Sequence, residues 1–177
     1  MVYRDLKQEN IGFDIRGDVK IFDFGLCKSL QDKSKAIGHG YHMTPYTGSV
    51  PYMAPEIGNG QPYDQSADVF SFAILFWEIL SMKDAFGQYS FEDYLTHVCE
   101  RKERPRLHRT WPTIVQVGLE EAWKDDPQAR PPMLRLANVI QGWLQNMTDD
   151  AWVEHRAEGM WNNSTGSRSD RELQKIE

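Results

Sequence analysis

The chain has 177 residues, a formal net charge of −6 and only two cysteines, Cys27 and Cys99, so we expect one domain with a tail. The acidic balance supplies no basic field for nucleic acid, and two distant cysteines exclude a disulfide framework and a cysteine-based zinc site. No apolar signal segment opens the chain, and the longest apolar run, residues 69–80, is shorter than the ~20 residues of a membrane span, so we expect a soluble cytoplasmic protein.

The first predicted element is a β-hairpin within residues 10–24. Two short apolar runs, residues 10–13 and 19–22, flank a turn that contains Arg16-Gly17-Asp18, and this pattern is typical of two short antiparallel strands. Residues 26–62 follow, rich in Gly, Ser, Thr, Lys and Pro and without a sustained hydrophobic period. They predict a long loop, and a loop of this length inside a domain is usually functional or mobile.

Four helices are predicted after the loop. Residues 66–81 are apolar nearly all round, which predicts a buried helix in the centre of the domain. Ser90 begins a capping-box-like pattern and a helix that runs to about Arg101, and a third helix covers residues 112–123. Pro131 and Pro132 open the last helix. Its expected apolar face consists of Leu134, Ala137, Val139, Ile140, Trp143, Leu144 and Met147.

Three short motifs occur in a fixed order along the chain. The segment from Tyr3 to Asn10 reads YRDLKQEN, residues 23–25 read DFG, and residues 54–56 read APE. Together they resemble the catalytic loop, the metal-binding loop and the end of the activation segment of a protein kinase.

The resemblance implies a fold and a division of the chain. We expect a mostly α fold with a small β-hairpin, namely the large, C-terminal lobe of the protein-kinase-like α+β fold, over residues 1–147. Residues 148–177 are then a C-terminal tail, and their polar composition predicts partial disorder.

The resemblance also implies the roles of four residues in phosphoryl transfer from ATP. Asp5 is the expected catalytic base for a substrate hydroxyl, and Lys7 is expected to contact the transferring phosphate. Asn10 and Asp23 are the expected ligands of Mg²⁺, which prefers hard oxygen atoms, and with Lys7 they complete the expected ATP site of this chain. Gln8 stands where the family commonly has proline, so we expect a slightly looser catalytic loop.

Two positions favour serine/threonine specificity and hence a serine or threonine hydroxyl on a protein substrate. Lys7 resembles the serine/threonine kinases at this position, and Ser49 stands where those enzymes carry a small hydroxyl residue that bonds the catalytic Asp and Lys. Softer positions, including Trp77 and Glu78 in the central helix, resemble the tyrosine-kinase-like branch.

Further family positions are structural or regulatory. The resemblance pairs Glu56 with Arg130, and assigns Asp68 to the backbone of the catalytic loop. Arg4 is expected to bind a phosphate placed on Thr44, Tyr46 or Thr47, with Ser34 a more distant candidate, by an upstream kinase or by autophosphorylation. The alternative is that Arg4 only packs against loop carboxylates.

Two functions remain open at this point. No glycine-rich loop, sheet lysine or helical glutamate precedes the catalytic loop in these 177 residues, so we expect an N-terminally incomplete catalytic domain with little activity by itself. The first function is an ATP- and Mg²⁺-dependent serine/threonine protein kinase. The alternative is a non-catalytic binding module of kinase fold.

Overall fold

The computed structural model describes residues 1–30, 35 and 38–145. Helices predominate, and the one sheet within the described residues has two strands, so the predicted mostly α fold with a small hairpin is confirmed. The chain divides into two units, residues 1–139 and 140–177, and everything described below lies in the first unless stated. The predicted tail, residues 148–177, lies outside the described residues.

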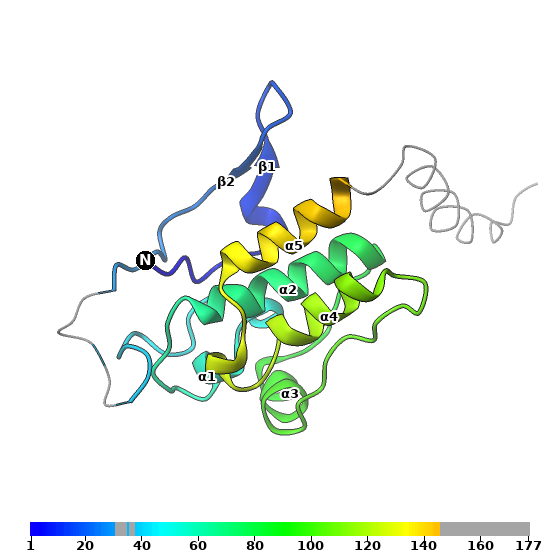
Figure 1. Cartoon of the computed structure of the whole chain (residues 1–177). Helices are drawn as coiled ribbons and strands as arrows, with labels where there is room; N and C mark the ends of the chain where they lie inside the picture. The colour runs from blue at the N-terminus through cyan, green and yellow to red at the C-terminus, as the bar shows by residue number, and fades with distance from the viewer. Residues whose placement is uncertain (31–34, 36–37, 146–177) are drawn as a thin grey trace, which may run out of the picture. The chain divides into compact units, whose positions relative to one another are not determined.

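The predicted hairpin is confirmed. Strand β1 (Ile11–Phe13) pairs antiparallel with β2 (Val19–Ile21), with Gly12 opposite Lys20. Figure 1 shows the hairpin standing away from α2. A side chain at Gly12 would place its Cβ 2.6 Å from the ring of Phe22, so glycine leaves the space that this ring fills. Twelve residues, 11–22, separate the YRDLKQEN and DFG motifs.

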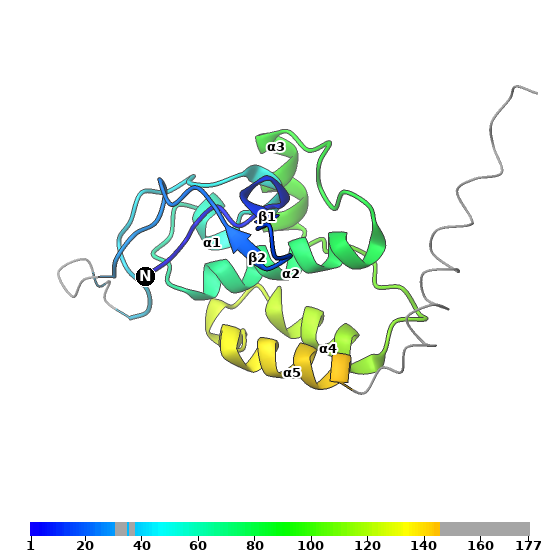
Figure 2. The ribbon, with the colours of Figure 1, turned by 90° about the horizontal axis from the view of Figure 1, so that it is seen from above.

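Helix α2 (Ser66–Ser81) has the predicted bounds and the predicted central position. Its buried side chains include Phe70, Ile74 and Trp77, and α4 (Thr113–Ala122) packs against it (Figures 1 and 2). The helix ends where Met82 takes a left-handed conformation with φ of 54°, which closes the last turn.

The predicted helix after Ser90 is confirmed, but it is not α-helical throughout. Ser90 and Asp93 form the predicted capping box at the start of α3 (Phe91–Tyr94). The chain continues as a π-helix, Leu95–Glu100, and turns away at Lys102, whose φ is 59°.

The long loop contains two short helical turns that the sequence pattern did not predict. Val50–Tyr52 forms a 3₁₀ turn, and Pro55–Gly58 forms α1. Each begins with a proline in its first turn, a placement that suits a helix start but is too short to give a hydrophobic period.

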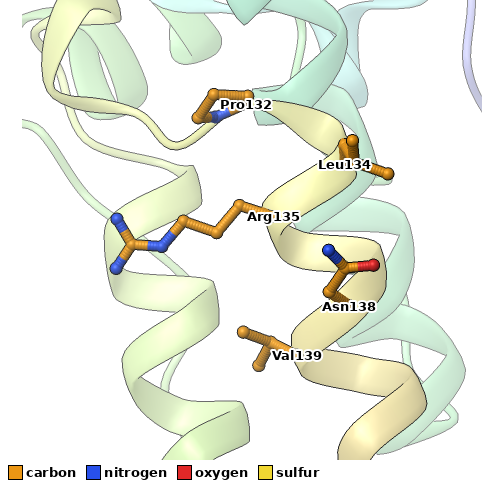
Figure 3. Close-up of a pocket in the computed structure, with 5 residues that line it drawn as sticks. All are labelled: Pro132, Leu134, Arg135, Asn138 and Val139. Carbon is orange, nitrogen blue, oxygen red and sulfur yellow. The ribbon is translucent and has the colours of Figure 1, made fainter.

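The apolar face predicted for the last helix, α5 (Met133–Gln145), is wrong at Leu134, Ala137 and Leu144, which are exposed, and the predicted Met147 lies outside the described residues. Leu136, which was not assigned to that face, is buried beside Gly118 of α4, whereas Leu134 is 72 % exposed. Leu136 thus lies on the side of α5 that meets Gly118 of α4. Figure 3 shows Arg135 extending from α5 toward α4, where it pairs with Glu121 at 3.4 Å, and Leu134 extending to the other side.

Candidate active site

The catalytic loop is anchored to the first turn of α2 by Asp68. Its two carboxylate oxygens accept hydrogen bonds from the backbone amides of Tyr3 at 2.7 Å and Arg4 at 2.8 Å, as the resemblance predicted. Burial raises the pKa of Asp68 above its usual value, against the effect of these two bonds. Arg4 is held at a φ of 72°, a strained conformation for a residue with a side chain, and the double contact with Asp68 supports it.

Asp5 is the centre of a hydrogen-bonded cluster. Its Oδ1 accepts bonds from the hydroxyl of Ser49 at 2.8 Å and from the Ser49 amide at 3.0 Å. Its Oδ2 lies 2.9 Å from Asn10 Nδ2 and 3.1 Å from Lys7 Nζ. Burial raises the pKa of Asp5, but the bonds from Ser49, Lys7 and Asn10 outweigh it and hold the pKa below its usual value. The carboxylate is thus ionised and fixed in orientation at neutral pH.

Lys7 and Ser49 close this cluster on its other side. The ammonium group of Lys7 donates to Ser49 Oγ at 2.8 Å, so Ser49 bonds both Asp5 and Lys7 as predicted. The two residues are separated by 42 positions in the chain. The cluster therefore joins the catalytic loop to the segment that precedes α1.

Gly48 makes this junction possible, and the sequence reasoning gave it no role. Its φ is 105°, and a Cβ at this position would lie 2.3 Å from the carbonyl oxygen of Arg4. No side chain fits between the two backbones, so only glycine lets Ser49 reach Asp5. The signal in the sequence was a glycine directly before the hydroxyl residue.

Asn10 is buried, and its amide has a defined orientation. Nδ2 donates to the backbone carbonyl of Asp5 at 2.8 Å and to its carboxylate at 2.9 Å. Both donor bonds point toward Asp5, which leaves Oδ1 of the amide as an oxygen ligand for a cation.

Asp23, the other expected metal ligand, lies apart from the cluster around Asp5. It is exposed, has a φ of 52°, and accepts a bond from the amide of Gly25 at 3.1 Å through Oδ1. In the part of the chain that the structure describes, no hydrogen bond joins Asp23 to Asp5 or Asn10, and no group of three His, Cys, Asp or Glu residues could hold a metal ion. A cation here would need oxygen atoms from the substrate as well.

Tyr3 connects the two loops. Its hydroxyl donates to the backbone carbonyl of Phe22, and its ring contacts Phe24 edge-on, with the ring centres 5.7 Å apart. Burial raises the pKa of Tyr3, and the negative charges of Asp5 and Asp23 raise it further. The Tyr3 hydroxyl thus lies in the field of both carboxylates and tethers the strand that leads to Asp23.

Gln8, at which a looser catalytic loop was expected, is itself hydrogen-bonded to α2. Its amide donates to the buried carboxylate of Glu78 at 2.9 Å, and the hydroxyl of Tyr52 donates to the same oxygen at 2.6 Å. The backbone amide of Ala85 bonds the other oxygen at 2.8 Å. Gln8 therefore replaces the rigidity of a proline with a tether to α2.

Comparison with known proteins identifies the family of the chain that carries this cluster. The family model described as "Protein kinase domain" matches residues 1–144. The chain belongs to the protein kinase family. In the described residues, no helix is long and apolar enough to cross a membrane.

Three similar kinases show the range of relatives. The chain is 32 % identical over 151 residues to the serine/threonine-protein kinase STY17 of Arabidopsis thaliana, covering 85 % of this chain and 25 % of that protein. It is 34 % identical over 146 residues to the dual specificity protein kinase shkC of Dictyostelium discoideum, with 78 % and 27 % covered. For the mitogen-activated protein kinase kinase kinase 7 of Drosophila melanogaster the identity is 32 % over 149 residues, with 84 % and 21 % covered. The chain thus spans about a quarter of the length of these curated relatives.

The kinase motif residue Arg4 bonds neutral groups. Its Nε donates to the carbonyl of Leu26 at 2.5 Å, and its Nη1 donates to the hydroxyl of Tyr63 at 3.1 Å. That hydroxyl in turn bonds the carbonyl of Thr44 at 2.9 Å. No ion pair of Arg4 with a carboxylate occurs among the described residues, so packing against carboxylates is not seen in the described part of the loop. Ser34 lies outside the described residues.

The predicted pair between Glu56 and Arg130 is confirmed. The guanidinium binds both carboxylate oxygens, at 2.7 and 2.8 Å, and both side chains are buried. This bidentate bond fixes α1 to the turn that precedes α5.

A surface pocket of about 450 Å³ lies along α5 and is shown in Figure 3. Its lining includes Leu134, Arg135 and Asn138, and none of the predicted site residues contributes to it. It is separate from the cluster around Asp5.

Proposed function

We propose that this chain carries the catalytic and substrate-binding part of a protein kinase that transfers the γ-phosphate of ATP to a serine or threonine of a protein. The observation that carries the proposal is the cluster of Asp5, Lys7, Asn10 and Ser49, in which both carboxylate oxygens of Asp5 accept hydrogen bonds. A partly buried, hydrogen-bonded cluster of this kind holds one carboxylate in a single orientation.

In this proposal Asp5 orients the attacking hydroxyl and accepts its proton. Because the pKa of Asp5 is held below its usual value, the carboxylate is ready as an acceptor at neutral pH, and proton transfer occurs late, when the phosphate bond is forming. Lys7 lies 3.1 Å from Asp5 and is partly exposed, so its ammonium can also contact the incoming phosphate. The proposed catalytic residues are therefore Asp5 and Lys7.

The donor set of Asn10 and Asp23 fits Mg²⁺ bound together with ATP. Both residues offer hard oxygen atoms, and Mg²⁺ commonly takes one or two protein ligands with the remainder from phosphates and water. When bound, the metal would neutralise phosphate charge. Asn10 is held by its two bonds to Asp5, whereas Asp23 is positioned by its own loop and by the tether from Tyr3.

Serine/threonine specificity rests on the bond between Lys7 and Ser49. This bond holds the segment before α1, which in the proposal binds the substrate peptide on either side of the acceptor hydroxyl. One similar kinase is named a serine/threonine-protein kinase. Another is named a dual specificity protein kinase, so the experiment must also test whether tyrosine is phosphorylated.

We place the kinase in the cytoplasm and propose regulation through Arg4. A phosphate on Thr44 or Thr47 would offer Arg4 a charged partner in place of the neutral groups that it now bonds, and would order the segment before Ser49. Either an upstream kinase or autophosphorylation could supply it.

The alternative is a binding module of kinase fold without transfer. The 177-residue polypeptide by itself brings only Lys7, Asn10 and Asp23 toward the phosphates, so we propose that it transfers little phosphate in isolation. The complete cluster around Asp5 favours the kinase, because a binding module has no need of these residue types at these distances.

The test uses a protein that contains this chain within a complete kinase domain. Transfer from labelled ATP to a peptide library with serine, threonine or tyrosine acceptors is measured for the wild type, Asp5→Ala and Asp23→Ala. We expect each variant to lose several orders of magnitude in rate, and the exposed-carboxylate control Glu120→Ala to behave like the wild type.

Two outcomes would contradict the proposal. Transfer that survives Asp5→Ala would remove the catalytic role of the cluster. ATP binding without any transfer by the wild type would support the binding module instead.

A further inference from the structure

The loop between the π-helix and α4 concentrates positive charge. Residues 101–109, called the basic loop below, hold five lysine and arginine side chains and one carboxylate, in a chain with a formal net charge of −6. The loop thus holds a quarter of the 20 lysine and arginine residues of the chain in nine consecutive positions. The excess requires an explanation outside the catalytic cluster, to which no residue of this loop belongs.

Part of this charge is compensated within the fold. Lys102 and Arg104 share the carboxylate of Asp125, at 3.1 and 2.5 Å. Glu103, the one carboxylate of the loop, contacts His97 at 3.0 Å instead of a cation of the loop. The remaining arginines have no ion pair or side-chain hydrogen bond among the described residues, and all of them are exposed: Arg101, Arg106 and Arg109. These three guanidinium groups are free to bind an anion.

The backbone that carries them is held in place. Arg104 donates to the carbonyls of Trp123 at 2.8 Å and Val98 at 3.0 Å, which fixes the loop to the elements on both sides. The indole of Trp77, on α2, donates to the carbonyl of Arg106 at 3.0 Å. Since both anchors are partly buried, the free arginines project from a fixed path and an incoming ligand need not order the loop.

A second contact fixes the end of the loop next to α4. The amide of Trp111 donates to the carbonyl of His108 at 3.1 Å, and the Trp111 ring meets that of Trp77 edge-on, with the ring centres 6.5 Å apart. The segment that contains Arg109 is thereby tied to the same tryptophan as Arg106.

We infer that the basic loop is a docking surface for an acidic segment of a partner protein, bound in an extended conformation. Guanidinium groups suit carboxylates because their planar fork can bind two oxygen atoms at once. The nine residues span at most about 28 Å, so an extended acidic segment of about eight residues matches the reach of the three arginines. The inference is independent of phosphate transfer.

The charge of the rest of the chain argues for a short peptide over a larger polyanion. A nucleic acid or an anionic membrane would extend well beyond the loop and meet the excess of carboxylates elsewhere on this acidic chain. A short acidic segment stays within the loop, and charges farther away than about 8 Å are screened at physiological salt.

The experiment measures binding of a fluorescently labelled peptide by anisotropy, with the full 177-residue chain. The probe is a peptide of glutamates interrupted by glycine, and the control probe carries glutamine in place of glutamate. We expect the glutamate peptide to bind and the glutamine peptide not to bind. The triple variant Arg101→Gln/Arg106→Gln/Arg109→Gln should weaken binding by about tenfold or more.

The matched control removes three exposed cations elsewhere, in Lys20→Gln/Lys83→Gln/Lys124→Gln, with the same change in net charge. It should retain the affinity of the wild type within about twofold, because the effect is local. Equal losses in the two triple variants would overturn the inference and leave only a general charge effect. Failure of the glutamate peptide to bind, while RNA or anionic vesicles bind through the same arginines, would also overturn it.

Discussion

The bond between Arg130 and Glu56 offers the sharpest test of what holds this lobe together. In Arg130→Met the guanidinium is removed and a side chain of similar length remains. The side chains of Arg130 and Glu56 are 0 % and 2 % exposed, so the carboxylate would stay buried without its cation. The variant also loses bonds to the carbonyls of Lys124, Ser66 and Asp125.

The expected loss is about 3–5 kcal/mol in the free energy of unfolding, the range for a buried ion pair deprived of one partner. A domain of this size has about 5–15 kcal/mol in total, so a large part of its stability would be lost. Replacing both partners, in Arg130→Met/Glu56→Gln, should recover a part of this loss because no charge then remains buried.

The assay is urea unfolding followed by tryptophan fluorescence, on the wild type and the variants. The matched control is the exposed pair of α4 and α5, Arg135→Met and Arg135→Met/Glu121→Gln, where the side chains are 65 % and 32 % exposed and each change should cost less than about 1 kcal/mol. If Arg130→Met cost no more than Arg135→Met, or if the double variant were as unstable as the sum of its two single changes, burial of the unpaired carboxylate would not be the main cause of the destabilisation.

Three further predictions concern the active site in a complete kinase domain. Gly48→Ala should destabilise the lobe by about 1–3 kcal/mol and reduce transfer, because a Cβ there meets the backbone of the catalytic loop; unchanged urea midpoint and rate would contradict the proposed close approach. The lowered pKa of Asp5 stabilises the fold at pH values above the unfolded pKa of about 4, and this stabilisation is lost as the pH falls through the folded pKa. Ser49→Ala removes one hydrogen-bond donor to Asp5 and should raise the pKa of its carboxyl group. The acid limb of the rate profile should therefore move to higher pH, and an unmoved limb would show that Ser49 does not tune Asp5. Thr44→Ala or Thr47→Ala should lower activity and remove a phosphate from the loop, which phosphosite mapping would detect; full activity with both threonines replaced would exclude this regulation.

Local patterns predicted most of the elements. The continuous apolar character of residues 66–81 predicted the bounds of α2, and the two apolar runs beside Gly17 predicted the hairpin, since both depend on neighbours in the chain. The family was predicted by resemblance, because each of the motifs YRDLKQEN, DFG and APE is a continuous stretch of the chain, and the family model confirms it. The pairing of Arg130 with Glu56 came from the resemblance alone, across 74 positions.

The tertiary structure decided what depends on distance and burial. Whether Leu134 or Leu136 is buried depends on which side of α5 packs against the rest of the fold, and no pattern within α5 records that. The bond of Gln8 to Glu78 spans 70 positions and gives the loop a contact with α2 that no local pattern predicts. The sequence by itself determined which chemical groups this kinase lobe carries and in what order. Their partners were decided only by folding, because a hydrogen bond needs a distance near 3 Å and spacing along the chain does not supply one.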